Sequence, residues 1–228
     1  MKQETFSFYN EDIYNVSNFI VYNENIEAYY YLNQDDDFNN NNHFIFLSGG
    51  KKCGKTYLAN IWKQKNNAKF IDYTSLSKLR YEKFVLEISK IIEQYDYYIL
   101  DDIKKPFDEK KLFFLLNLII QQHSKILITS DFAFNKIKIT LKDLKSRINS
   151  GMFLVIKKLS KEIKPMLILK LFADRSTKAS GQVLKYLVKT LPNDYEAVYN
   201  YIDTMIKTAE DNDEKLTFAF VKNFKLNS

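Results

Sequence analysis

Cysteine, proline and glycine are scarce in this sequence: its 228 residues include one Cys, three Pro and five Gly. A single Cys excludes a disulfide framework and is typical of a chain kept in a reducing compartment. So few Gly and Pro, together with 46% hydrophobic residues, exclude collagen-like, low-complexity and wholly disordered chains. The length allows one large domain, or a core with a small second domain.

Long hydrophobic runs are also missing. No apolar stretch approaches the length that a membrane span needs, and residues 1–9 lack the basic-then-apolar pattern of a signal peptide. We therefore expect a soluble cytoplasmic protein without a membrane partner.

Arginine is the scarce cation. The net charge of +6 comes from 34 basic and 28 acidic residues, yet only Arg80, Arg147 and Arg175 are arginines. Residues 175–228 hold eight basic and seven acidic residues, so they are not a DNA-binding tail, and we expect contact with DNA only indirectly. Where lysine is the usual cation, an arginine indicates a place that needs a planar donor.

Short apolar runs alternate with segments of helical periodicity in the first two thirds of the chain. Uniformly apolar strands that alternate with helices predict an α/β fold, with a parallel sheet covered by helices on both faces. The expected strands are residues 44–48, 68–73, 97–100, 125–129 and 152–156, and the expected helices are residues 25–32, 56–64, 81–94, 110–122 and 139–149.

The strand patterns stop after Leu159, and only helical periodicity follows. It predicts helices at residues 161–173, 179–190 and 194–209 and a short one at 217–224. We therefore expect three parts: a tail at residues 1–15, a nucleotide-binding α/β core at 16–159, and a small all-helical lid at 160–228.

A phosphate-binding loop is predicted between the first expected strand and the next helix. Residues 49–56 fit the pattern G-x-x-x-x-G-K-[ST] in the strand-to-helix context that this motif requires. Free N–H groups at the helix start attract phosphate, and the predicted phosphate ligands are Gly49, Gly50, Gly54, Lys55 and Thr56. The Thr56 hydroxyl should also ligate Mg²⁺. The cofactor is then ADP or ATP with Mg²⁺, and the alternative is a chance Gly/Lys turn.

Two carboxylates follow the third expected strand. Asp101 is predicted to hold Mg²⁺, and Asp102 to orient or activate a water molecule. The next strand ends in hydroxyl groups, and we expect Ser130 there to sense the γ-phosphate. A polar strand-to-helix turn is the alternative for Ser130.

Arg147 lies near the end of a predicted helix. A lone surface arginine is usually solvated. Because arginine is so scarce here, we favour an arginine finger that is donated to the nucleotide of a neighbouring subunit.

Taken together, these residues resemble the DnaA-related AAA+ ATPases over nearly the whole chain. Residues 18–21 and 25–28 resemble the family's segment that lines the adenine pocket, which implies that Phe19, Ile20 and Asn25 contact the base. Residues 144–147 resemble the family's segment that carries the arginine finger. The resemblance implies an AAA+ P-loop core with a parallel sheet and a small helical lid.

The resemblance is closest to the Hda group of this family, the regulatory inactivators of DnaA. It implies two partners, DnaA and the DNA polymerase III sliding clamp (its β subunit). Gln3, Phe6 and Phe8 resemble the short clamp-binding motif, in which a glutamine is followed by spaced apolar anchors. A disordered or edge-packed tail is the alternative for these three residues.

One position departs from the family. The lid arginine that family members point at the nucleotide phosphates falls on Glu196 here. A carboxylate would repel a γ-phosphate, so we expect bound ADP or weak nucleotide binding rather than a robust ATPase.

These observations lead to one hypothesis and two alternatives. The hypothesis is a negative regulator of replication initiation that stimulates hydrolysis of DnaA-bound ATP through Arg147. The first alternative is a stand-alone ATPase such as a DnaC-like helicase loader, and the second is a non-catalytic clamp-binding scaffold. Homo-oligomerisation stays open.

Overall fold

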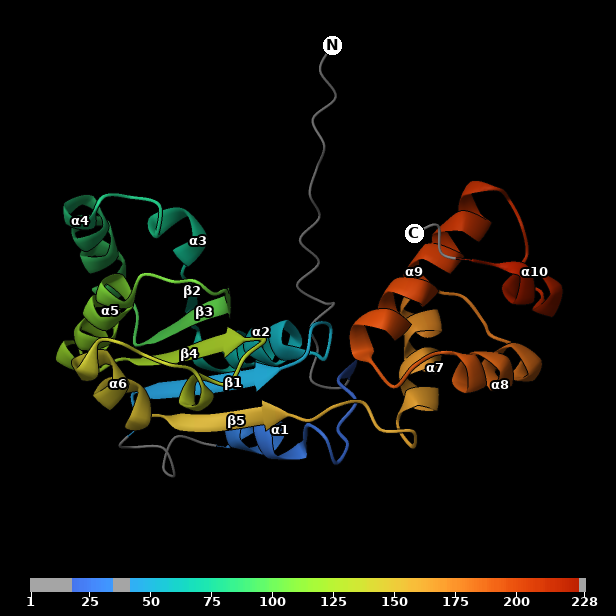
Figure 1. Ribbon diagram of the computed structural model, residues 1–228, viewed down its shortest axis with the longest axis horizontal. Coiled ribbons are helices and arrows are strands. Elements are labelled where there is room, and N and C mark those ends of the chain that lie inside the picture. Colours follow the sequence, from blue (N-terminus) through green and yellow to red (C-terminus); the bar gives the residue numbers. More distant parts are fainter. Residues whose placement is uncertain (1–17, 35–41, 226–228) are drawn as a thin grey trace, which may run out of the picture.

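The computed structural model describes residues 18–34 and 42–225. Within them, five parallel strands form one sheet in the order β2-β3-β4-β1-β5 (Figure 1). The strands are β1 Phe44–Gly49, β2 Lys69–Phe70, β3 Tyr97–Ile103, β4 Lys125–Ser130 and β5 Met152–Ile156. The chain leaves β1 for one side of the sheet and later crosses it to form β5 on the other. Such a crossover opens a crevice at the carboxyl ends of the strands.

Helices cover both faces of the sheet, because alternate residues of each strand point to opposite sides. Ile45, Leu47 and Leu127 pack against the helices α1 and α2, whereas Phe44 and Phe46 pack against α4, α5 and α6. Each fully buried side chain of this size stabilises the fold by about 1.5–3 kcal/mol. The helices of this part are α1 Ile26–Asn33, α2 Lys55–Asn66, α3 Tyr73–Leu76, α4 Tyr81–Ile92, α5 Glu109–Gln121 and α6 Lys142–Asn149, with the short 3₁₀ helix η4 Phe134–Lys136.

A helical part follows β5 and faces the arrowheads of the strands (Figure 1). Side-chain caps start three of its helices: Ser180, Asp194 and Thr217 each accept a hydrogen bond from a backbone N–H in the first turn. The helices are α7 Lys164–Asp174, α8 Gly181–Thr190, α9 Tyr195–Asp211 and α10 Phe218–Asn223. Their apolar faces join the core that lies over α1 and α2.

The predicted fold class is confirmed, with two corrections to its strands. The second strand is two residues long, instead of residues 68–73, because Asp72 caps α3 by accepting a hydrogen bond from the Ser75 N–H. The third strand continues through Asp101 and Asp102 to Ile103 instead of ending at Leu100. Within the described residues no helix is both long and apolar enough to cross a membrane.

Gly151 connects α6 to β5 where no side chain fits. A Cβ there would lie 2.6 Å from Phe46 Cε2 and 3.0 Å from the Phe44 carbonyl oxygen. We expect Gly151→Ala to lower the free energy of unfolding by about 1–3 kcal/mol, because the core must shift to accept the methyl group. Urea denaturation measures this change. The matched control is Gly181→Ala, where a Cβ meets nothing within 4 Å; equal losses in both variants would contradict the packing argument.

Candidate functional site

The loop between β1 and α2 is the segment that the sequence predicts to bind phosphate. Gly54 precedes α2 with a φ of 103°, a conformation that side chains disfavour. Gly49 is required for a different reason, since a Cβ there would lie 2.7 Å from Cys53 Sγ and 3.2 Å from the Ile156 carbonyl oxygen. Gly50 has open space around it. The loop therefore lets the backbone N–H groups at the start of α2 face a ligand.

Lys55 lies across this loop. Its side chain is buried, and its ammonium group donates hydrogen bonds to the carbonyl oxygens of Gly49, at 2.9 Å, and Gly50, at 2.8 Å. These carbonyl groups hold the ammonium at the loop, from which it can transfer to a phosphate oxygen.

Asp101 lies between two hydroxyl groups. The Thr56 hydroxyl donates to Asp101 Oδ2 at 2.8 Å, and the Thr129 hydroxyl donates to Asp101 Oδ1. Thr56 and Asp101, both predicted to bind Mg²⁺, are thus brought together. Hydroxyl and carboxylate oxygens are the donors that Mg²⁺ prefers, so this set fits the ion.

Thr129 is a site residue that the sequence prediction missed. Besides contacting Asp101, its hydroxyl accepts a hydrogen bond from the Asp102 N–H at 2.7 Å. The register of β3 on β4 shifts between Leu100 and Ile103, which places the carboxylates opposite Thr129. The predicted sensor Ser130 is buried, and its hydroxyl donates to the Phe132 carbonyl oxygen. The β4 hydroxyl that reaches the Asp101 carboxylate is therefore that of Thr129, not that of Ser130.

Asp102 has a φ of 58°, in the left-handed region that few non-glycine residues adopt. Its carboxylate accepts a hydrogen bond from the Lys104 ammonium at 2.6 Å, and Asp131 lies 3.5 Å from the same ammonium. The hydrogen bond to Asp102 raises the pKa of Lys104 above its usual value. Lys104 is thus a second site residue that the sequence prediction missed.

A mostly apolar cavity of about 160 Å³ lies between the segment before α1 and the helical part. Phe19 and Ile20, which the resemblance assigns to the adenine pocket, line this cavity. Asn25 also lines it, but its amide is used within its own segment: Nδ2 donates to the Ile20 carbonyl oxygen, and Oδ1 accepts from the Tyr22 N–H. Asn25 therefore shapes the segment rather than offering an unpaired amide to a base.

Tyr22 and Tyr195 join that segment to α9. Their hydroxyl groups lie 3.0 Å apart. Burial raises the pKa of Tyr22 and also that of Tyr195 above the usual tyrosine value, so both phenols stay protonated at neutral pH. The contact between Tyr22 and Tyr195 is therefore a hydrogen bond between two neutral hydroxyl groups.

Glu196 lies at the mouth of a second cavity, of about 490 Å³, which covers the phosphate loop. Its carboxylate forms an ion pair with Lys51 at 3.3 Å. Lys52, on the same loop, lies 4.3 Å from the centre of the Tyr199 ring on α9. The first turns of α9 thus contact the phosphate loop directly.

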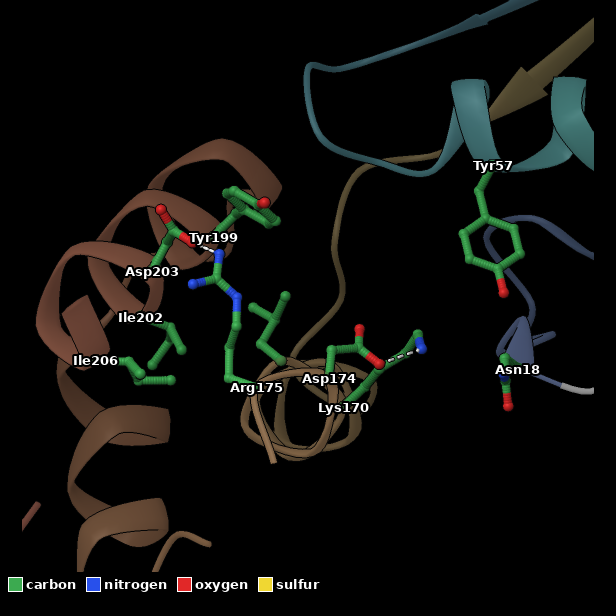
Figure 2. Close-up of a pocket in the computed structure, with 10 residues that line it drawn as sticks. Asn18, Tyr57, Lys170, Asp174, Arg175, Tyr199, Ile202, Asp203 and Ile206 are labelled. Carbon is green, nitrogen blue, oxygen red and sulfur yellow. Dashed lines mark hydrogen bonds and ion pairs between the residues drawn. The ribbon is translucent and has the colours of Figure 1, made fainter. Parts of the chain in front are cut away.

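A third cavity, of about 440 Å³, adjoins the apolar one (Figure 2). Tyr57 on α2 and Tyr199 on α9 line both cavities, and so do Lys170, Leu171 and Asp174 of α7. Arg175 points at Asp203 and forms an ion pair with it, and Lys170 pairs with Asp174 at 2.9 Å (Figure 2). Arg175, one of the three arginines, is therefore paired within the helical part.

Arg147 lies in the last turn of α6 and is exposed. Its Nε donates to Asn117 Oδ1 on α5 at 3.0 Å. Because α6 leads into the start of β5, Arg147 lies at the amino ends of the parallel strands. The phosphate loop follows the carboxyl end of β1. The guanidinium group and this chain's own phosphate loop therefore lie at opposite ends of the strands.

Gln3, Phe6 and Phe8 lie outside the described residues. Among the residues that are described, no group of three or more His, Cys, Asp or Glu side chains could hold a metal ion by itself.

No protein-family profile and no curated protein matches the sequence. Solved structures are similar in fold. Domain III of the replication initiation protein DnaA from Thermotoga maritima is 18% identical over 91% of this chain and 93% of that one, with a TM-score of 0.72. AMPPCP-bound DnaA from Aquifex aeolicus is 20% identical over 86% of this chain and 64% of that one, with a TM-score of 0.66. The RuvB branch migration motor from Thermotoga maritima is 14% identical over 79% and 60%, with a TM-score of 0.58.

These likenesses show the fold. The chain has the parallel sheet and flanking helices of the AAA+ domain of DnaA, followed by a helical C-terminal part.

Proposed function

We propose that this protein is a DnaA-related negative regulator of replication initiation. It binds adenine nucleotide, docks on the sliding clamp and stimulates hydrolysis of DnaA-bound ATP. The single observation that carries the proposal is the exposed guanidinium group of Arg147, at the edge of the sheet opposite the chain's own phosphate loop. A guanidinium at that edge can serve a nucleotide held by another subunit. There it would stabilise the charge that spreads over the γ-phosphate oxygens in the transition state.

The chain's own pocket supports nucleotide binding. The cavity at the phosphate loop, which Lys55 lines, would take the phosphates, and the neighbouring apolar cavity would take the base. DnaA from Aquifex aeolicus, which has the same fold, was solved with AMPPCP bound. Thr56 and Asp101 would hold Mg²⁺. When bound, that ion neutralises charge between the phosphates.

Docking on the clamp is assigned to the tail, where Gln3 would donate and accept hydrogen bonds while Phe6 and Phe8 fill apolar pockets. A tether of this kind raises the local concentration of the regulator near DnaA on newly replicated DNA. It acts in the cytoplasm and reaches DNA through the clamp.

The decisive experiment follows turnover of radiolabelled ATP on DnaA, with and without this protein and clamp loaded on DNA. We expect faster turnover only when protein and loaded clamp are both present. Appreciable hydrolysis without DnaA, dependent on Lys55 and Asp102, would favour a stand-alone ATPase of the helicase-loader kind. Clamp binding without any effect on DnaA would favour a scaffold. The ATPase alternative is supported by the contacts of Asp101 with Thr56 and Thr129, because they assemble the residues that would hold Mg²⁺.

The charge of Glu196 should affect the affinity of this chain for nucleotide. Its carboxylate lines the cavity at the phosphate loop and is paired with Lys51. We expect Glu196→Arg to tighten ATP binding about five- to tenfold, because the change frees the Lys51 ammonium and replaces a repelling charge by an attracting one. Titration calorimetry with ATP and ADP measures both affinities, and the gain should be larger for ATP. The matched control is Glu210→Arg, an exposed position farther along α9. An equal gain in both variants would indicate a general charge effect.

A further inference from the structure

The Lys104 ammonium lies between two carboxylates at the end of the sheet. It is 2.6 Å from Asp102 Oδ1 and 3.5 Å from Asp131 Oδ2. Lys104 also lines the cavity over the phosphate loop, together with Asp102 and Lys55. The Lys104 ammonium is therefore paired with the Asp102 carboxylate, the group that would face the attacking water.

The backbone of Asp102 is held in an uncommon conformation. Its φ of 58° is a conformation that persists only when the surroundings hold it, and the N–H is fixed by Thr129. The carboxylate, which is half exposed, leaves this fixed point toward Lys104.

Hydrolysis of ATP needs a free acceptor at this place. The water oxygen bonds to the γ-phosphorus, the bond from that phosphorus to the β–γ bridging oxygen breaks, and a proton of the water passes to the acceptor. ADP and inorganic phosphate leave. A carboxylate already paired with an ammonium is a weaker acceptor, because its charge is shared.

We propose that Lys104 is a positioning residue that withholds the Asp102 carboxylate from water and so restrains hydrolysis of the nucleotide that this chain itself binds. The inference rests on the proposed nucleotide binding. The Lys104–Asp102 pair would let the chain keep its nucleotide unhydrolysed while Arg147 acts on the ATP of another subunit. The hydrogen bond to Asp102 raises the pKa of Lys104, so the ammonium is charged at neutral pH.

The test measures the chain's own ATP turnover under single-turnover conditions, beside its affinity for ATP. We expect Lys104→Ala to raise the rate about five-fold, the size that loss of a half-exposed ion pair allows, with the affinity for ATP changed less than about twofold. Lys104→Gln should give the same rise, and Lys104→Arg should keep the low rate. Adding Asp102→Asn to Lys104→Ala should return the rate to the wild-type value or below, since the freed acceptor is then removed.

Lys105→Ala is the matched control, because the Lys105 ammonium lies over the Phe132 ring at 4.6 Å rather than beside Asp102. It should leave the rate unchanged. An unchanged or lower rate in both Lys104→Ala and Lys104→Gln overturns the inference, as does a double variant that stays fast. Absence of ATP binding contradicts the proposed nucleotide site and this inference together. Failure to stimulate DnaA contradicts only the regulator, because turnover by the chain alone is measured without DnaA.

Discussion

Arg147→Ala should abolish stimulation of DnaA-bound ATP hydrolysis, reducing the stimulated rate by about a thousandfold. An arginine finger contributes about 10³–10⁵ to the turnover rate, since it neutralises charge that exists only in the transition state. The change should not disturb the fold, because the Arg147 side chain is exposed and, among the described residues, it donates a hydrogen bond only to Asn117. Turnover of radiolabelled ATP on DnaA, with loaded clamp present, measures the loss.

Three further variants make this result specific. Arg147→Lys keeps the charge and loses the planar fork, so most of the stimulation should still be lost. Asn117→Ala removes the acceptor that orients the guanidinium group, and a smaller, several-fold loss is expected. Arg80→Ala, at an exposed arginine before α4, should change nothing. Binding to the clamp in a pull-down should be equal in all variants; full stimulation by Arg147→Ala would end the proposed mechanism.

Lys55→Ala should weaken binding of ATP and ADP about 10- to 100-fold. The ammonium is buried at the phosphate loop, and charge-assisted hydrogen bonds of this kind contribute about 1.5–3 kcal/mol each. In the absence of nucleotide the fold should lose little beyond the two hydrogen bonds that Lys55 donates to the Gly49 and Gly50 carbonyl groups. Fluorescence anisotropy with a labelled adenine nucleotide measures the affinity.

A second variant and a control show whether the loss of affinity comes from the charge of Lys55. Lys55→Met keeps the length of the side chain and removes the charge, so it separates loss of phosphate contact from loss of packing. Lys63→Ala, two turns later on α2, should bind nucleotide as the wild type does. Thermal unfolding with added ADP gives an independent reading, because a ligand raises the melting temperature only of a chain that binds it. Equal affinity in Lys55→Met and the wild type would contradict the phosphate site.

Much of the fold could be predicted because its signals are local. An apolar run, a Gly-Lys turn and a helix-period segment are neighbours in the chain, so the phosphate loop and α2 could be predicted from residues 44–64 alone. The short second strand was predicted too long, since the cap of α3 by Asp72 competes with extended backbone. Asn25 could be placed beside the apolar cavity, but the use of its amide within its own segment depends on contacts that no pattern shows.

The sequence by itself determined the alternation of strands and helices, the phosphate loop and the scarcity of arginine, because periodicity and motif spacing are properties of neighbouring residues. Only the tertiary structure decided which hydroxyls meet Asp101, which cation meets Asp102, and whether Arg147 is exposed. Thr129 lies 28 residues beyond Asp101, and their meeting depends on the register shift between two strands. Arg147 and Arg175 are the same residue type in similar helix ends, yet packing leaves one exposed at the amino edge of the sheet and pairs the other with Asp203.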